Sequence, residues 1–163
     1  MTTPAPLFHC DHTLCELRTG LELVQDEVAT ALAAHGYEDG AMFAIRLALE
    51  EAIVNGFRHG NRSDPTKCVF FRATIDSVSA EFEIEDQGPG FDPRMIPDPT
   101  EDDNLEIPSG RGVMLIKAYM TDVEYVRPGN KLRMRYATLR ALSDHDRIMP
   151  APWRSACAAY CRA

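Results

Sequence analysis

The chain has 163 residues, 45% of them hydrophobic, which suits one compact domain with a sizeable core rather than two domains. Its formal net charge of -8 provides no basic field for a phosphate backbone, so nucleic acid is excluded as the main partner and a protein or small-molecule partner is favoured. No apolar run approaches the roughly 20 residues needed to cross a bilayer, and residues 1–10 lack the features of a secretory signal, so we expect no membrane association and a cytoplasmic location.

Two amphipathic helices are predicted in the first part of the chain. Residues 17–35 place apolar side chains at steps of three and four, and Gly36 is a natural C-terminal stop. Residues 41–59 repeat this spacing after a GYEDG turn, with Asp39 available as an N-terminal cap, before GNRSDP ends the pattern.

A hairpin and a long loop follow the helices. CVFFRATID (68–76) and SAEFEIED (79–86) are short β-rich runs, and the second alternates apolar with acidic residues as a half-buried strand does. Residues 87–110 are rich in proline, glycine and acidic side chains, so most of them form no regular element. A segment of this length inside one domain is usually a functional lid or is disordered.

The rest of the pattern completes an α+β fold. Residues 111–120 form a third predicted helix, and DVEYV (122–126) and KLRMRYATL (131–139) are two strands joined by an RPGN turn. This order predicts a two-layer α/β sandwich, with the helices on one face of a mixed, mostly antiparallel sheet. The domain is expected to span residues 1–141, followed by a tail over 142–163 that is either docked or disordered.

Three polar residues interrupt the apolar pattern of the second helix. Glu51, Asn55 and His59 are spaced by four residues, which stacks them along one helical face. Burying a carboxylate or an amide without a partner costs on the order of several kcal/mol. The stripe is therefore either a solvated edge of the helix or the wall of a binding site, and the helix alone does not decide between these.

The segment EDQGPGF (85–91) presents an acidic group beside glycines. Asp86 ends a predicted strand and is followed by Gly88 and Gly90, whose lack of a Cβ lets a ligand approach the backbone. The carboxylate is then placed to accept a hydrogen bond from an exocyclic amine, although a plain turn after a strand has the same composition.

The segment SGRGVMLIKAY (109–119) places two glycines at the start of the third helix. The free N–H groups of Gly110 and Gly112 and the helix dipole favour an anion such as a phosphate. A glycine-rich helix cap is the alternative.

In their order and spacing, these three segments resemble the N box and the two glycine boxes of the GHKL, or Bergerat, ATP-binding fold. More narrowly they resemble the anti-sigma factor serine kinases, over residues 17–139. The resemblance implies that the protein binds ATP and Mg²⁺ and phosphorylates a STAS-type anti-anti-sigma partner on serine or threonine. It also implies binding to a sigma factor and a homodimeric state.

Individual roles carry over from the same resemblance. Asn55 would bind Mg²⁺, Glu51 would act as the general base, and Asp86 would read the adenine amino group. His59 and Gly60 would lie where the N box approaches the phosphates. The other implied nucleotide contacts are Gly88, Gly90, Ser109, Gly110, Arg111 and Gly112.

The segment over residues 92–108 would form the ATP lid, and Arg94 or Arg111 would stabilise the transferring charge. Two features depart from the family pattern. The turn at Gly129, Asn130 and Lys131 lacks the threonine that helps to hold adenine, and the lid is more acidic than a segment close to a triphosphate should be.

Two other functions fit the same boxes. The protein would be a non-catalytic anti-sigma binding protein whose conformation depends on ATP, and an acidic surface suits a basic partner. Alternatively it is a stand-alone histidine-kinase-type catalytic module, which would act in trans because we find no dimerisation helix with a phosphoacceptor histidine.

The five cysteines are odd in number and scattered, so a disulfide framework is not expected and the thiols should be reduced. A zinc site can be drawn from soft ligands near the N-terminus together with a later cysteine pair, but their spacing matches no known finger pattern. The N-terminal segment reads equally well as an edge strand. The residues concerned are His9, Cys10, His12, Cys15, Cys157 and Cys161.

Overall fold

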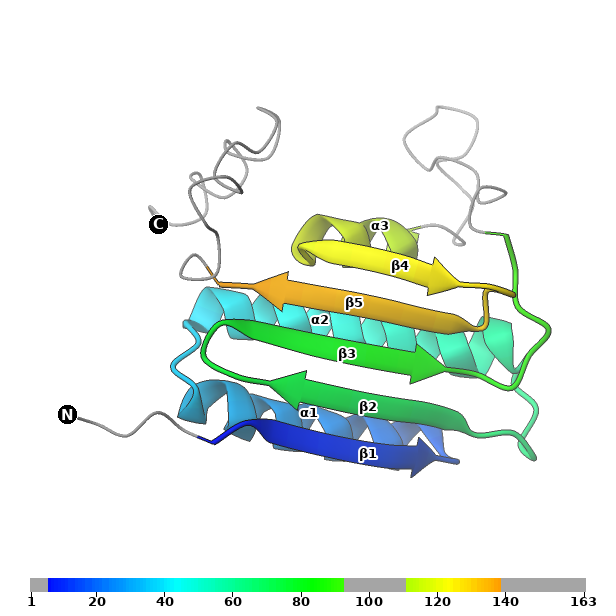
Figure 1. Cartoon of the computed structure of the whole chain (residues 1–163). Coiled ribbons are helices and arrows are strands. Elements are labelled where there is room, and N and C mark those ends of the chain that lie inside the picture. The colour runs from blue at the N-terminus through cyan, green and yellow to red at the C-terminus, as the bar shows by residue number, and fades with distance from the viewer. Residues whose placement is uncertain (1–5, 93–110, 139–163) are drawn as a thin grey trace.

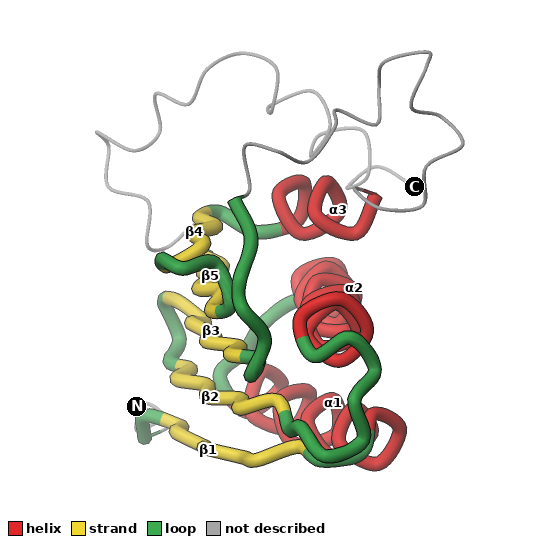
Figure 2. The backbone as a smooth tube through the Cα atoms, turned by 90° about the vertical axis from the view of Figure 1, so that its right-hand side faces the viewer, coloured by secondary structure: helices red, strands yellow, loops and turns green. Residues whose placement is uncertain are grey.

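A five-stranded sheet forms one layer of the protein and three α-helices form the other, as Figure 1 and the side view in Figure 2 show. The computed structural model describes residues 6–92 and 111–138. The strands lie in the order β1-β2-β3-β5-β4, and every neighbouring pair is antiparallel. The expected α+β sandwich is confirmed, and within the described residues its sheet is antiparallel throughout.

The predicted elements correspond closely to those observed. The strands are β1 (Phe8–Leu14), β2 (Val69–Ile75), β3 (Ser79–Glu85), β4 (Asp122–Val126) and β5 (Lys131–Ala137). The helices are α1 (Leu17–Ala34), α2 (Asp39–Asn55), the π-helical turn η1 (Gly56–Gly60) and α3 (Arg111–Tyr119). The order thus begins with a strand, so the edge-strand interpretation of the N-terminal segment is correct.

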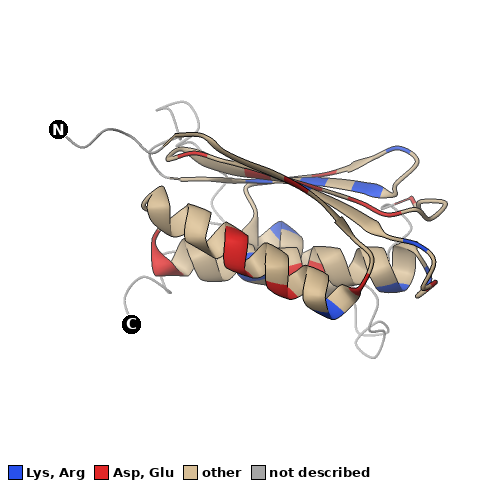
Figure 3. Ribbon diagram, turned by 90° about the horizontal axis from the view of Figure 1, so that it is seen from below, with Lys and Arg blue, Asp and Glu red and all other residues tan. Residues whose placement is uncertain are grey.

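Alternation along the strands separates the two faces of the sheet. Phe71, Phe82 and Ile84 are buried against the helices, because successive side chains of a strand point to opposite faces. The outer face carries cross-strand ion pairs, such as those that Arg72 and Arg133 make with Glu83. Figure 3 shows basic and acidic positions interspersed along the strands. Exposed pairs of this kind contribute about 0–1 kcal/mol each, so the buried face dominates stability.

Local hydrogen bonds fix where the helices begin and end. The Glu16 carboxylate accepts from the backbone N–H groups of Arg18 and Thr19 at 3.0 and 2.8 Å, which caps α1. Gly36 follows α1 with φ of +76°, a conformation that favours glycine. The prediction that Asp39 caps α2 is wrong: Glu38 occupies the cap position without a side-chain hydrogen bond, and Asp39 lies in the first turn.

The cysteines correct a second expectation. Cys15 and Cys68 form a disulfide between the start of α1 and the start of β2, so the expectation of reduced thiols throughout is wrong. Cys10 is a free, buried thiol, and its pKa is raised to about 11 by burial and by the nearby Glu27 carboxylate. Cys157 and Cys161 lie outside the described residues.

Among the described helices, none is both long enough and apolar enough to cross a membrane.

Candidate functional site

The N-terminal turn of α3 packs against two polar side chains of α2. A Cβ atom built at Gly112 would lie 2.5 Å from Oε2 of Glu51 and 3.2 Å from Nδ2 of Asn55. Because any larger residue would intrude on these two groups, glycine at this position lets the backbone of α3 approach them closely. The structure therefore brings together the acidic residue, the amide residue and the second glycine cluster, which are far apart in the sequence.

The apolar faces of the two helices account for this meeting. Leu49 and Ile53 of α2 are fully buried, and so is Ile116 of α3. Glu51 and Asn55 lie half-buried on α2. Burial of the apolar residues fixes both helices, and the side chains between them then line the contact rather than the core.

The amide oxygen of Asn55 suits a hard cation, and the Glu51 carboxylate lies near it. Mg²⁺ takes oxygen ligands, usually one or two from protein, and keeps waters and phosphate oxygens for the remainder. A carboxylate and an amide lie beside the N-terminal turn of α3, where Gly112 adds no side chain. They provide such oxygens next to a helix N-terminus, which favours an anion. The residues present therefore fit a magnesium ion carried by a phosphate ligand.

Asp86 forms a second cluster, with Gly60 and Gly88. Its Oδ1 accepts a hydrogen bond from the Gly88 N–H at 2.8 Å. A Cβ at Gly60 would overlap the Asp86 carboxylate, and a Cβ at Gly88 would overlap the Gly60 carbonyl oxygen. The end of the N box and the start of the first glycine box thus pack backbone to backbone around one carboxylate.

The surroundings of Asp86 perturb its acidity. Burial raises the pKa of Asp86, and the neighbouring Glu85 charge adds to the rise, while the Gly88 hydrogen bond and Lys67 oppose it. A partly buried carboxylate is also a stronger hydrogen-bond acceptor than one that is fully exposed to water. The position therefore suits recognition of a neutral N–H donor such as an aromatic amine.

Asn130 fixes the backbone of Asp86, a role that sequence reasoning missed. The Asp86 N–H donates to the Asn130 carbonyl at 2.8 Å, and the Asn130 side-chain amide donates to the Asp86 carbonyl at 2.9 Å. Next to it, Gly129 has φ of +105°, and a Cβ there would overlap the backbone of Phe91. The turn that lacks the family threonine therefore still docks onto the first glycine box.

Asn61 is a second residue that sequence reasoning missed. It is only 1% exposed; its Oδ1 accepts from the Gln87 N–H at 2.7 Å and its Nδ2 donates to the Cys68 carbonyl at 2.9 Å. The Cys68 N–H in turn donates to Oε1 of Gln87 at 2.7 Å. The only available signal was an asparagine directly after the N box, since a polar loop residue is as often exposed as buried.

The expected three-residue stripe is interrupted. The α-helix predicted to continue to residue 59 ends at Asn55, and η1 follows with the wider spacing of a π-helix, so the four-residue repeat does not extend to His59. His59 is exposed. A π-helical turn often marks a functional segment, and here it ends at the glycine that contacts Asp86.

Other predicted site residues are placed only in part. Gly90 packs against the backbone of Pro128 and Gly129, and Arg111 is the first residue of α3. Ser109, Gly110 and Arg94 lie outside the described residues. The same holds for the predicted lid beyond Asp92 and for the tail over 142–163.

Comparisons with known proteins give one family. The chain matches a family model described as a histidine kinase-like ATPase domain over residues 16–136. A comparison with curated proteins gives no significant match.

Proposed function

Since the chain belongs to the histidine kinase-like ATPase domain family, we propose that it binds Mg·ATP between α2 and α3 and acts as an anti-sigma factor with serine/threonine kinase activity. Membership of an ATPase family supports ATP as the ligand. The observation that carries the proposal is the approach of Gly112 to Glu51 and Asn55, because it brings a helix N-terminus, a carboxylate and an amide together. These are the groups that a metal-bound triphosphate needs.

The cluster around Asp86 and the cluster around Glu51 and Asn55 contact different parts of the nucleotide. Asp86 accepts a hydrogen bond from the adenine amino group, and the glycines packed beside it add no side chain next to its carboxylate. Asn55, with Glu51 nearby, would lie at the phosphates, and its amide oxygen would hold Mg²⁺. The metal, when bound, neutralises phosphate charge and polarises the γ-phosphate.

The proposed transfer needs one base. The hydroxyl oxygen of a partner's serine or threonine attacks the γ-phosphorus, its proton passes to the Glu51 carboxylate, and the bond from the γ-phosphorus to the bridging oxygen breaks to release ADP. Glu51 is the acidic residue of α2 closest to the α3 N-terminus in sequence and structure, which supports its assignment to this role.

We propose a STAS-domain anti-anti-sigma protein as the phosphorylated partner and a sigma factor as the second partner, with the chain acting as a homodimer. The net charge of -8 supports a basic partner surface. A stand-alone histidine-kinase-type module would instead transfer the phosphoryl group to histidine, which acid treatment of the product distinguishes from a stable phosphoserine.

We assign the protein to the cytoplasm, where sigma factors and their regulators act. Disulfides are uncommon in that compartment, so the Cys15–Cys68 bond argues against the assignment. Alkylation of thiols in intact cells, followed by mass spectrometry of the peptide that contains Cys15, decides the matter: a fully reduced Cys15 supports the cytoplasm and a fully oxidised one contradicts it.

The first test is calorimetric titration of ATP into the protein with and without Mg²⁺, together with Asn55→Ala and Asp86→Asn. We expect micromolar, Mg²⁺-dependent binding that both substitutions weaken. Absence of binding to the wild type contradicts the nucleotide site altogether and leaves a protein-binding module.

The second test is transfer of labelled γ-phosphate to candidate STAS proteins. Glu51→Gln should keep ATP affinity and lose transfer by at least about 100-fold, since general-base catalysis contributes roughly 10²–10⁴-fold. If the wild type binds ATP and sequesters a sigma factor but transfers no phosphate to any STAS protein, the non-catalytic anti-sigma alternative replaces the kinase.

A further inference from the structure

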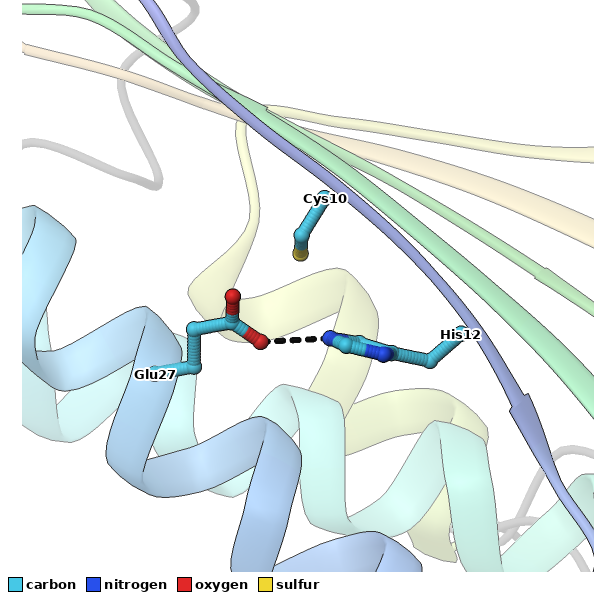
Figure 4. Close-up of side chains that lie close together, drawn as sticks. All are labelled: Cys10, His12 and Glu27. Carbon is cyan, nitrogen blue, oxygen red and sulfur yellow. Dashed lines mark hydrogen bonds and ion pairs between the residues drawn. The ribbon is translucent and has the colours of Figure 1, made fainter.

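Three potential metal ligands converge at the β1 edge of the fold, away from the nucleotide site. Cys10 and His12 belong to β1 and Glu27 belongs to α1, and Figure 4 shows the three side chains directed toward one another. Their ligand atoms, one from each residue, all lie within 4.8 Å of one another. Nε2 of His12 and Oε2 of Glu27 are 2.5 Å apart.

Strand periodicity explains why the cluster forms. Cys10 and His12 are two residues apart, so both point to the inner face of the sheet, where α1 packs. His9 and Asp11 point the other way, and each bonds to a residue of β2 on the outer face. The cluster is therefore built from one face of an edge strand and one helix, and the proposed ATP chemistry uses none of its members.

The cluster is sheltered but open to entry. Cys10 is 7% exposed, whereas the side chains of His12 and Glu27 keep 26% and 34% of their exposure. The soft ligand thus lies at the bottom, with the imidazole and the carboxylate toward solvent. An ion can enter past these two groups without opening the core.

The mixture of donor atoms selects the type of metal. Thiolate sulfur, imidazole nitrogen and carboxylate oxygen together are typical of zinc, whereas magnesium and calcium prefer oxygen ligands alone. Tetrahedral zinc with bonds of about 2.0–2.3 Å holds its donor atoms roughly 3.3–3.8 Å apart. The present spread needs only small side-chain rotations to reach this range, because all three side chains already face one point.

We propose that Cys10, His12 and Glu27 bind one zinc ion, with water in the fourth position. The ion takes the place of the His12–Glu27 hydrogen bond and joins the edge strand β1 to α1. Cys15, which appeared as a potential ligand in the sequence, is excluded by its disulfide, and Glu27 takes the place that sequence spacing could not identify.

Cobalt(II) is a suitable probe, because a cobalt–thiolate bond gives a charge-transfer absorption that oxygen and nitrogen ligands do not give. Chelator-treated protein, prepared without a histidine tag, is titrated with Co²⁺ and then with Zn²⁺ as competitor. We expect a stoichiometric thiolate band that zinc abolishes, and a rise in melting temperature on adding zinc.

Each ligand has a substitution of similar shape. Cys10→Ser should remove the thiolate band, and His12→Gln and Glu27→Gln should weaken zinc binding by at least about tenfold, since even changes around a ligand cost roughly 10–100-fold. His9→Gln is the matched control, because this histidine lies on the same strand and points away. Melting of each metal-free variant verifies that it folds.

Two results overturn the proposal. One is wild-type protein that gives no thiolate band, or binds zinc no more tightly than His12→Gln does. The other is a band that persists in Cys10→Ser and disappears in a Cys157→Ser/Cys161→Ser variant, which would assign the thiolate to the C-terminal cysteine pair.

Discussion

The two ends of the proposed nucleotide site are built in opposite ways. Around Asp86, hydrogen bonds connect the backbone and side-chain groups of Asp86, Gly88, Asn130, Gln87 and Asn61. Around Glu51 and Asn55, the backbone of Gly112 lies close by, and neither side chain forms a hydrogen bond within residues 6–92 and 111–138. A hydrogen-bonded end can hold a rigid base in one orientation, whereas an end with free polar groups can take up charge and metal.

Adding a side chain at Gly112 should have the largest effect on binding. Gly112→Val places methyl groups where Oε2 of Glu51 now lies, so we expect ATP affinity to fall at least about 100-fold, or about 2.7 kcal/mol, with little change in melting temperature. Calorimetry measures the affinity. Gly40→Val is the control, because nothing lies within 4 Å of a Cβ there. Unchanged affinity in Gly112→Val would show that the phosphates bind elsewhere.

Removing the buried amide of Asn61 should disrupt the hydrogen-bonded end of the proposed site, around Asp86. Asn61→Ala leaves the part-buried Cys68 carbonyl and Gln87 N–H without their partner, and each such group costs up to about 1–3 kcal/mol. We expect the free energy of unfolding in urea to fall by about 2–4 kcal/mol. Arg58→Ala, on the exposed side of η1, should change it by less than about 0.5 kcal/mol. Equal stability of the two variants would mean that water replaces the amide.

Asp86→Asn should separate binding from stability. The amide cannot accept from adenine as the carboxylate does, so affinity should fall about 10–100-fold, in line with roughly 1.5–3 kcal/mol for a hydrogen bond to a charged group. The folded protein should not lose stability, because burial raises the pKa of Asp86 and its ionised form is disfavoured in the fold.

The pH dependence of stability provides a second measure of the same substitution. Since the pKa of Asp86 is higher in the folded than in the unfolded chain, wild-type stability falls as pH rises from the unfolded value through the folded one. Asp86→Asn lacks this fall, so its stability relative to wild type should increase over that window. Urea titrations of both proteins from acidic to neutral pH check the sign, and a difference of opposite sign would mean that Asp86 is stabilised as a charge.

His59→Ala should have the smallest effect. The side chain is exposed on the π-helical turn, so we expect ATP affinity to change less than about threefold and stability by less than about 0.5 kcal/mol. A loss of affinity as large as that of Asp86→Asn would show that His59 turns inward when nucleotide binds.

Most of the fold was predictable, because it depends on apolar periodicity. The helical stripe before Gly36 and the alternation of Phe82 and Ile84 with glutamates fix both the type and the buried face of their elements. The order of the boxes identified Glu51, Asn55 and Asp86 as a group, and the structure gives each of the two clusters its glycines.

The missed features depend on contacts distant in sequence. Pairing Cys15 with Cys68 requires two Cα atoms close in space, which composition cannot reveal across a separation of 53 residues. The roles of Asn61 and Asn130 require knowledge of which backbone groups lack partners once the fold has formed. Glu27 is one of several acidic residues of an amphipathic helix, and only the packing of β1 beside α1 places it next to His12.

The Cys15–Cys68 disulfide gives the chain a mechanical asymmetry. It closes a covalent ring that contains α1, α2 and η1, whereas Asp86 and Gly112 lie outside the ring. Tension applied at the two termini would bypass the ring and draw Asp86 and Gly112 away from Glu51 and Asn55 while α1 and α2 stay joined. Only after reduction would the enclosed 53-residue span lengthen the extended chain, by about 180 Å. Tension would therefore separate the proposed site between α2, which lies inside the disulfide-closed ring, and the segments that contain Asp86 and Gly112, which lie outside it.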